Sequence, residues 1–124
     1  MRRATATALL IDPETIPRQV SGEVDPGVLA LVRDLRAAGR PVASAGGADG
    51  GPAGEVPTVG VDGAPRRSKA YFVAACRALG LPPDRVLFLT GEEWAVRGAR
   101  VAGLAAYRWT GPDDVRYLRS ALGL

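Results

Sequence analysis

The 124-residue sequence has no histidine and a single cysteine, Cys76. Without histidine, neither a Ser-His-Asp triad nor a histidine metal site can form, so any acid–base chemistry falls to carboxylates, lysine or tyrosine. A lone cysteine cannot form a disulfide within the chain, which is typical of proteins kept in the reducing cytoplasm. We therefore expect a cytoplasmic protein whose chemistry, if it has any, uses one of these three groups.

Long apolar runs and concentrated charge are also lacking. No run approaches the length of a membrane span, and the start Met1-Arg2-Arg3 lacks the apolar stretch of a signal peptide. The 16 basic and 13 acidic residues give a net charge of +3, and the basic ones are scattered along the chain. Nucleic-acid-binding proteins usually concentrate their charge and add aromatic residues for stacking. The sequence thus predicts one globular domain over residues 1–124, with neither a membrane nor a nucleic acid as partner.

The segment from Ala4 to Thr15 is the one around which the chain is organised. Its apolar run Ala8-Leu9-Leu10-Ile11 is followed by the acidic turn Asp12-Pro13-Glu14-Thr15. Such a run is typical of a strand buried on both faces of a parallel sheet. Ligands of open α/β sheets bind just beyond the carboxyl ends of the strands, so Asp12 and Glu14 are the first candidates for chemistry. The alternative is that Asp-Pro only forms the turn.

Helical and strand patterns alternate along the rest of the chain. Helices are expected over residues 26–38, 68–79 and about 93–102 and again after Pro112, and strands over 41–44, 58–61, 86–89 and 104–109. This alternation predicts a three-layer, Rossmann-like α/β fold, in which helices flank a parallel sheet through right-handed crossovers. The stretch Ala45 to Pro57 is predicted to be a loop, because it is rich in Gly, Ala and Pro and has no periodicity. Its Gly46-Gly47 and Gly50-Gly51 pairs could hold a phosphate, but they lack the spacing of a phosphate-binding loop.

Four polar residues follow predicted strands. If the strands are parallel, Asp12, Glu14, Ser44 and Thr90 lie along one edge of the sheet, although they are far apart in sequence. A nucleophilic carboxylate (Asp12), a second carboxylate that protonates the leaving group (Glu14) and a hydroxyl that holds phosphate (Ser44) suit phosphoryl transfer. Ser44 could equally be only a small residue at a strand end.

Two cations precede or begin the helix over residues 68–79. Arg66 or Lys69 could reach the same edge and bind a phosphate beside Ser44. The alternative for each is a solvated charge on the helix.

These features together resemble the haloacid dehalogenase superfamily, most of whose members are phosphatases that form an aspartyl-phosphate. Leu9-Leu10-Ile11-Asp12-Pro13-Glu14-Thr15 is similar to the family's first motif, with Asp12 at the nucleophile position and Glu14 at the acid–base position. Pro41-Val42-Ala43-Ser44 is similar to the second motif, with Ser44 as the phosphate-binding hydroxyl. The resemblance implies Mg²⁺ as cofactor.

The later motifs carry the resemblance over the rest of the chain. Arg66 to Gly80 resembles the helix with the third-motif cation, for which Arg66 and Lys69 compete. Leu79 to Leu89 and Arg97 to Leu104 resemble the strand and helix around the fourth motif. Between Thr15 and Asp25 there is no room for a cap domain, so the resemblance implies an open site suited to a large or protein-borne phosphate.

The chain departs from the family at the fourth motif. Acidic metal ligands normally end this strand, but Thr90 and Gly91 stand in those places and Glu92 and Glu93 follow them. Magnesium is held chiefly by carboxylates and water, so the loss of charge weakens the expected site. Glu92 is nevertheless the candidate ligand beside Asp12, although both glutamates also suit the first turn of a helix.

Trp94 stands where the metal-independent dehalogenase branch often has an aromatic residue, and we assign it to packing.

Two hypotheses about function follow. In the first, the metal site is degraded and the domain is a pseudoenzyme, a pseudo-phosphatase that binds a protein partner or a phosphorylated ligand. In the second, it is a slow Mg²⁺-dependent phosphohydrolase acting through Asp12. The missing acids after residue 89 favour the first.

Overall fold

The computed structural model describes residues 6–12, 26–45, 58–59 and 68–124 of the chain. The strands are β1 (Ala8–Ile11), β2 (Val42–Ala45), β3 (Thr58–Val59), β4 (Val86–Thr90) and β5 (Ala105–Arg108). The helices are α1 (Pro26–Ala37), α2 (Lys69–Leu79), α3 (Glu93–Val101) and α4 (Val115–Ala121), with 3-10 turns at Pro83–Arg85 and Pro112–Asp114. The predicted alternation of strands and helices is confirmed, with boundaries that differ by a few residues.

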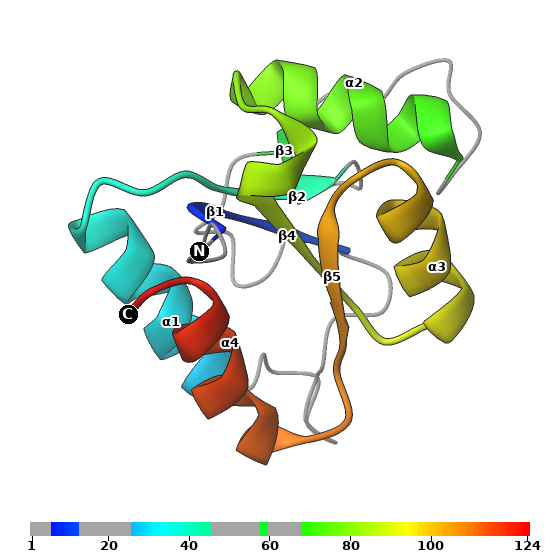
Figure 1. Cartoon of the computed structure of the whole chain (residues 1–124). Coiled ribbons are helices and arrows are strands. Elements are labelled where there is room, and N and C mark those ends of the chain that lie inside the picture. Colours follow the sequence, from blue (N-terminus) through cyan, green and yellow to red (C-terminus); the bar gives the residue numbers. More distant parts are fainter. Residues whose placement is uncertain (1–5, 13–25, 46–57, 60–67) are drawn as a thin grey trace, which may run out of the picture.

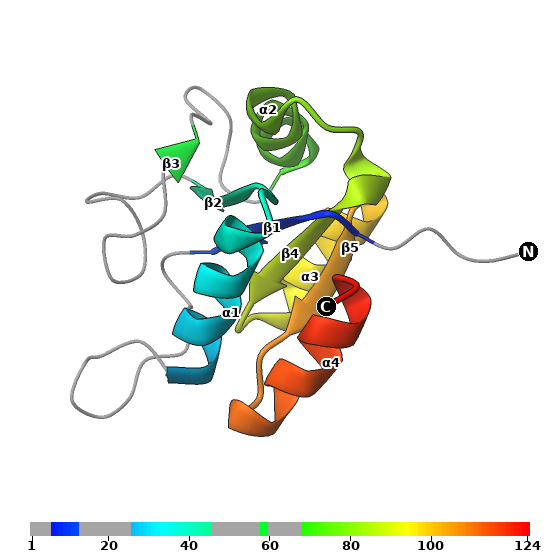
Figure 2. The ribbon, with the colours of Figure 1, turned by 90° about the vertical axis from the view of Figure 1, so that its left-hand side faces the viewer.

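The five strands form one parallel sheet in the order β3-β2-β1-β4-β5. Helices α1 and α4 cover one face of this sheet, and α2 and α3 cover the other (Figures 1 and 2). The fold is therefore the expected Rossmann-like, three-layer α/β arrangement. Its strand order reverses direction between β1 and β4, the position at which such sheets open a crevice for ligands beyond the strand ends.

Each face of the sheet contributes to its own apolar core. Leu9, Ile11 and Leu89 belong to the core beneath α1 and α4, whereas Leu10 and Phe88 belong to the core beneath α2 and α3. All four residues of β1 are fully buried, because the strand is central and both its faces are covered. This confirms the prediction made from the run at residues 8–11.

Helix α2 begins and ends as its sequence predicts. The Ser68 hydroxyl accepts a hydrogen bond of 3.2 Å from the Tyr71 amide, which is the usual role of a serine at an N-cap. At the other end, Gly80 adopts a left-handed conformation with φ of 73°, which favours glycine.

The buried face of α2 differs from the predicted one. We expected Phe72, Val73, Cys76 and Leu79 to point inward. Phe72 and Cys76 are buried, and the half-buried Leu79 packs against the same core. Val73 is only half-buried, and Tyr71 is buried in addition. The reason is aromatic packing: the ring of Phe72 lies edge-on to both Tyr71 and Phe88, with centroid distances of 5.2 and 4.9 Å. These contacts place Tyr71 on the inward face of the helix.

Arg40, between α1 and β2, ties together distant parts of the backbone. Its guanidinium donates hydrogen bonds of 3.0 Å to the Thr7 carbonyl and 2.9 Å to the Ala6 carbonyl, and a further one to the Leu122 carbonyl. The start of β1 and the end of α4 are therefore fixed next to each other. On the same face, Arg119 of α4 forms an ion pair of 2.6 Å with Asp34 of α1.

Candidate functional site

The carboxyl ends of β1 and β4 carry the two polar side chains at the centre of the candidate site. The register pairs Ile11 with Leu89, so Asp12 and Thr90 follow as the next neighbours. The Asp12 amide continues the ladder by donating a hydrogen bond of 2.9 Å to the Leu89 carbonyl. Since side chains alternate along a strand, Asp12 and Thr90 point to the same face of the sheet as Leu10 and Phe88.

Asp12 and Thr90 are joined by a direct hydrogen bond. The Thr90 hydroxyl donates to Oδ2 of Asp12 over 2.9 Å, and it accepts a hydrogen bond of 3.2 Å from the Glu92 amide. Both Asp12 and Thr90 are 0% exposed. The hydroxyl is thereby oriented by the backbone after β4, and its single proton points at the carboxylate. Thr90 is not among the residues to which we assigned a role in the site from the sequence.

Ser44 lies at the same edge of the sheet but in a different position. It pairs with Ile11 in the register of β1 and β2, one residue short of Asp12, and it is fully buried. Alternation along the strands therefore directs Ser44 toward the face covered by α1 and α4, whereas Asp12 points toward α2 and α3. Asp12, Ser44 and Thr90 share this edge, but the sheet does not bring Ser44 onto the face of the Asp12–Thr90 pair.

Lys69 is the first residue of α2, and its side chain is exposed. Helix α2 connects β3 to β4 on the face toward which Asp12 points, so its first residue lies at the carboxyl edge of the sheet. Within the described part of the chain, the Lys69 ammonium makes no ion pair. The competing cation Arg66 and the predicted acid Glu14 lie outside the described residues, so the structure does not place them.

Glu92 occupies the N-cap position of α3 and is half-buried. Its Oε2 accepts a hydrogen bond of 2.8 Å from the indole nitrogen of Trp94. Glu93 lies 3.8 Å from Arg97 in an exposed ion pair one turn along the helix. In residues 6–12, 26–45, 58–59 and 68–124, no three metal-ligating side chains gather as a metal site requires. Mg²⁺ held by Asp12 and Glu92 stays a prediction.

Trp94, which we assigned to packing, lies outside the apolar core. Its side chain is 52% exposed at the start of α3, because the buried face of this helix consists of the smaller residues Ala95, Val96 and Ala99. The indole reaches Glu92 instead of the interior.

A second polar cluster, centred on Asp114, was not predicted from the sequence. The Asp114 carboxylate accepts hydrogen bonds from the Thr110 amide (2.6 Å), the Thr110 hydroxyl (2.9 Å), the Tyr107 hydroxyl (3.0 Å) and the Gly111 amide (3.2 Å). Burial by itself raises the pKa of Asp114, but these hydrogen bonds outweigh it and hold the pKa below its ordinary value. The pKa of Tyr107 is raised, chiefly by burial and then by its hydrogen bond to Asp114 and the negative charge of Asp114. The cluster orders the turn between β5 and α4, so its role is structural.

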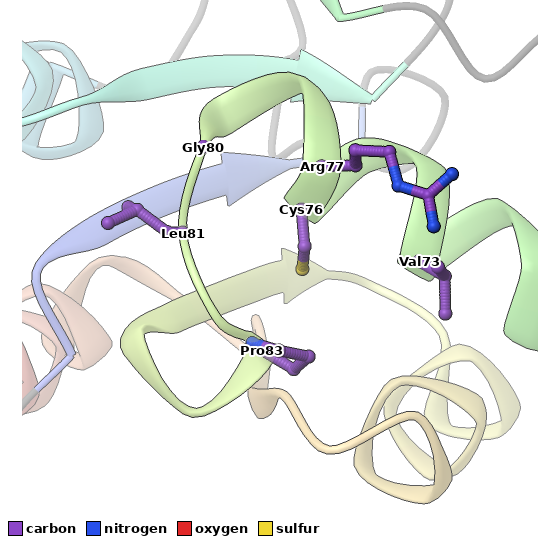
Figure 3. Close-up of a pocket in the computed structure, with 6 residues that line it drawn as sticks. All are labelled: Val73, Cys76, Arg77, Gly80, Leu81 and Pro83. Carbon is purple, nitrogen blue, oxygen red and sulfur yellow. The ribbon is translucent and has the colours of Figure 1, made fainter.

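An open hollow of about 370 Å³ lies at the opposite end of the sheet. Figure 3 shows the residues that line it, which come from the end of α2 and the turn before β4: Val73, Cys76, Arg77, Gly80, Leu81 and Pro83. Cys76 is 3% exposed, and burial raises the pKa of its thiol, so the thiolate form that reacts is disfavoured. The hollow contains none of the predicted site residues.

Comparison with known proteins adds support for the fold. No protein-family profile and no curated protein matches the chain. The chain is similar to the crystal structure of an uncharacterized protein from Corynebacterium glutamicum ATCC 13032 Kitasato, with a TM-score of 0.75 and 21% sequence identity over 95% of this chain and 96% of the other. At this identity the likeness establishes the fold alone. In the described part of the chain, no helix is long and apolar enough to cross a membrane.

Proposed function

We propose that the chain is a haloacid dehalogenase-like domain that has lost its metal site and acts by binding a partner, as a regulatory pseudo-phosphatase. The hydrogen bond between Thr90 and Asp12 carries this proposal. By the resemblance, an acidic residue in the place of Thr90 would help Asp12 to hold Mg²⁺. A neutral hydroxyl there satisfies the Asp12 carboxylate without adding the charge that a magnesium site needs.

The burial of Asp12 supports the same conclusion. A carboxylate that attacks phosphorus must reach the substrate, yet Asp12 is 0% exposed and accepts a hydrogen bond from the Thr90 hydroxyl. A buried charge with hydrogen-bond partners is stable, so the pair stabilises the junction of β1 and β4 without any catalytic role.

Charge favours a protein over a phosphorylated ligand as the partner. Asp12 at the end of β1 and Glu92 and Glu93 at the start of α3 are all acidic. Without a metal ion these carboxylates repel phosphate, and Lys69 offsets only part of their charge. A protein surface can avoid this repulsion, so a protein is the occupant we propose.

The second candidate function is slow Mg²⁺-dependent phosphohydrolysis. The position of Asp12, next to the point where the strand order reverses, favours it, as does the location of Lys69 on the same face. In this reaction Asp12 would attack phosphorus while the ester bond to the leaving oxygen breaks and Glu14 supplies a proton to that oxygen. Water would then hydrolyse the aspartyl-phosphate to inorganic phosphate and restore Asp12.

Calorimetry with Mg²⁺ and turnover of a generic phosphomonoester distinguish the two candidates. Wild type and Asp12→Asn are compared side by side. We expect no magnesium binding and no turnover in either protein. Binding and turnover in the wild type that both disappear in Asp12→Asn would reject the pseudo-phosphatase and establish the hydrolase.

Titration with inorganic phosphate then tests the choice of partner. Amide chemical shifts of Thr90 and Lys69 are followed by NMR while phosphate is added. We expect no saturable shift, as repulsion by the acidic edge predicts. A saturable shift that Lys69→Gln abolishes would identify a phosphorylated ligand in place of a protein.

A further inference from the structure

The hollow between the end of α2 and the turn before β4 has mainly apolar walls. Val73, Leu81 and Pro83 are each half-buried, so part of their apolar surface still meets water there. Cys76 adds a thiol that burial keeps neutral, and Figure 3 shows its sulfur on the side of the helix that faces Pro83. A Cβ atom at Gly80 would have no heavy atom within 4 Å, so the chain leaves this side open. An apolar molecule that enters the hollow therefore removes apolar surface from water, which favours its binding.

Arg77 is the one charged residue among the described residues that line the hollow. It follows Val73 by four positions, so the two side chains lie on the same face of α2. Within the described part of the chain, its guanidinium makes neither an ion pair nor a hydrogen bond. Its N–H donors are therefore available to a ligand in the hollow.

The other described charges near the hollow also favour an anion. Helix α2 contains no acidic residue. The turn before β4 carries Asp84 and Arg85, whose opposite charges offset each other. The residues just after α3 lie against Pro83, and the last turn of α3 carries Arg100 and no acidic residue. The balance of these charges is positive, so a negatively charged group is attracted to this end of the sheet.

The negative end of the α2 dipole does not cancel this attraction. The carbonyls of Arg77 and Cys76 accept hydrogen bonds of 3.1 and 3.2 Å from the amides of Gly80 and Leu81. These carbonyls are thus paired within the chain. The dipole itself amounts to about half an elementary charge, which is less than the full charge of Arg77.

We propose that this hollow binds a small amphipathic carboxylate, with its apolar body against Val73, Leu81 and Pro83 and its carboxylate at the guanidinium of Arg77. A guanidinium holds a carboxylate through two parallel hydrogen bonds. One arginine matches the single charge of a carboxylate, whereas a phosphate monoester carries nearly two.

The dimensions of the hollow set the size of the ligand and its affinity. Its volume of about 370 Å³ is near the lower end of the range for small-molecule sites, about 300–1,000 Å³. Because the hollow is open, part of the ligand stays in water, and we expect a dissociation constant of about 1 mM for a short-chain carboxylate. The inference is independent of the proposed function, because Asp12 and Thr90 lie at the opposite end of the sheet.

Titration of the full chain with octanoate tests the site. Amide chemical shifts are followed by NMR while octanoate is added at concentrations at which it is monomeric. We expect saturable shifts centred on Cys76, Arg77, Gly80 and Leu81. The absence of saturable shifts in these amides would overturn the proposal.

A comparison with octanol tests the role of Arg77. Arg77→Gln is expected to weaken octanoate binding about twofold to fivefold and to leave the binding of neutral octanol unchanged. Arg97→Gln is the matched control, because it removes the same charge from an exposed helical position outside the hollow. It should bind both molecules like the wild type. An octanoate affinity that falls equally in both variants would show that Arg77 does not hold the carboxylate, and would overturn the assignment.

Filling the hollow tests the place of the apolar body. Val73→Phe puts a larger side chain into the hollow and should weaken octanoate and octanol alike, by about tenfold or more. Val101→Phe is the same change at an exposed position of α3 and should have no effect. Val73 is half-buried beside open space, so the variant should fold, which circular dichroism checks. A folded Val73→Phe protein that binds octanoate as well as the wild type would place the ligand elsewhere and overturn the proposal.

Discussion

The hydroxyl of Thr90 donates a hydrogen bond of 2.9 Å to the carboxylate of Asp12, which lies 78 residues earlier in the chain. This bond connects the ends of two adjacent central strands. Both partners are fully buried, so removing one of them leaves the other short of a hydrogen-bond partner in the interior.

Thr90→Val should therefore destabilise the protein by about 1–3 kcal/mol, since it leaves the Asp12 carboxylate short of a donor at nearly unchanged volume. Urea unfolding measures the change in the free energy of unfolding. Thr90→Ser keeps the hydroxyl and serves as the control, with an expected loss smaller than that of Thr90→Val.

A double-mutant cycle with Asp12→Ala isolates the coupling between the two side chains, which we expect to be about 1–3 kcal/mol. If the two changes are additive, the hydrogen bond does not hold the strand ends together.

If the resemblance to the fourth motif holds, acidic residues placed at positions 90 and 91 should create a metal site. We expect Thr90→Asp combined with Gly91→Asp to lower the melting temperature without metal, because like charges then crowd around Asp12. Saturating Mg²⁺ should reverse this loss, since binding to the folded state adds about 2.7 kcal/mol when free metal is 100 times its dissociation constant.

Thermal melting with and without Mg²⁺ measures both effects. Two control proteins should show no rise in melting temperature with Mg²⁺. One is the wild type, and the other is the double variant to which Asp12→Asn has been added. Equal responses of all three proteins would indicate that the resemblance at the fourth motif is misleading.

Asp114 should make the protein less stable as the pH falls into the acid range. Its folded pKa is lowered from the ordinary value of 3.8, so its contribution to stability is complete above that value and is lost as pH falls through the lower, folded pKa. Asp114→Asn should cost about 1–3 kcal/mol at neutral pH, and the difference from wild type should shrink below about pH 4.

Urea unfolding of both proteins from neutral pH to below pH 3 tests this dependence. Tyr107→Phe removes one of the four hydrogen bonds and should leave most of the dependence in place. A difference that is constant with pH would show that the charge of Asp114 is not what stabilises the turn.

Arg40→Met should destabilise the chain by about 2–3 kcal/mol, because three backbone carbonyls lose a charged donor. Methionine keeps the aliphatic stem of the side chain, so the loss reports on the guanidinium. Hydrogen exchange should increase at the start of β1 and at the end of α4.

Arg77→Met is the control, since the exposed Arg77 side chain donates to no carbonyl in the part of the chain that is described. Similar losses from both substitutions would mean that the carbonyl contacts of Arg40 contribute little.

The α/β layering could be predicted because its signals are local. The run Ala8–Ile11 indicates a doubly buried strand, and the serine at position 68 with the glycine at position 80 marks the ends of α2. The Asp12–Thr90 bond could not be predicted, because it depends on the register that pairs Ile11 with Leu89. A shift of that register by one residue would direct one of the two side chains to the other face.

The exposure of Trp94 could have been predicted from the pattern of small residues along α3, although tryptophan is usually buried. Large aromatic residues are usually buried, but Ala95, Val96, Ala99 and Ala102 already form a complete inward stripe along α3, which leaves Trp94 outside it. The Asp114 cluster had no such signal, because its donors meet only where β5 ends against the turn before α4.

The three carbonyl contacts of Arg40 bring residues 6 and 122 to the same side chain. A short linker could therefore join the two ends of the folded unit, and the chain could be reopened elsewhere as a circular permutant without disturbing the sheet. Such a permutant would keep Arg40 beneath the new junction.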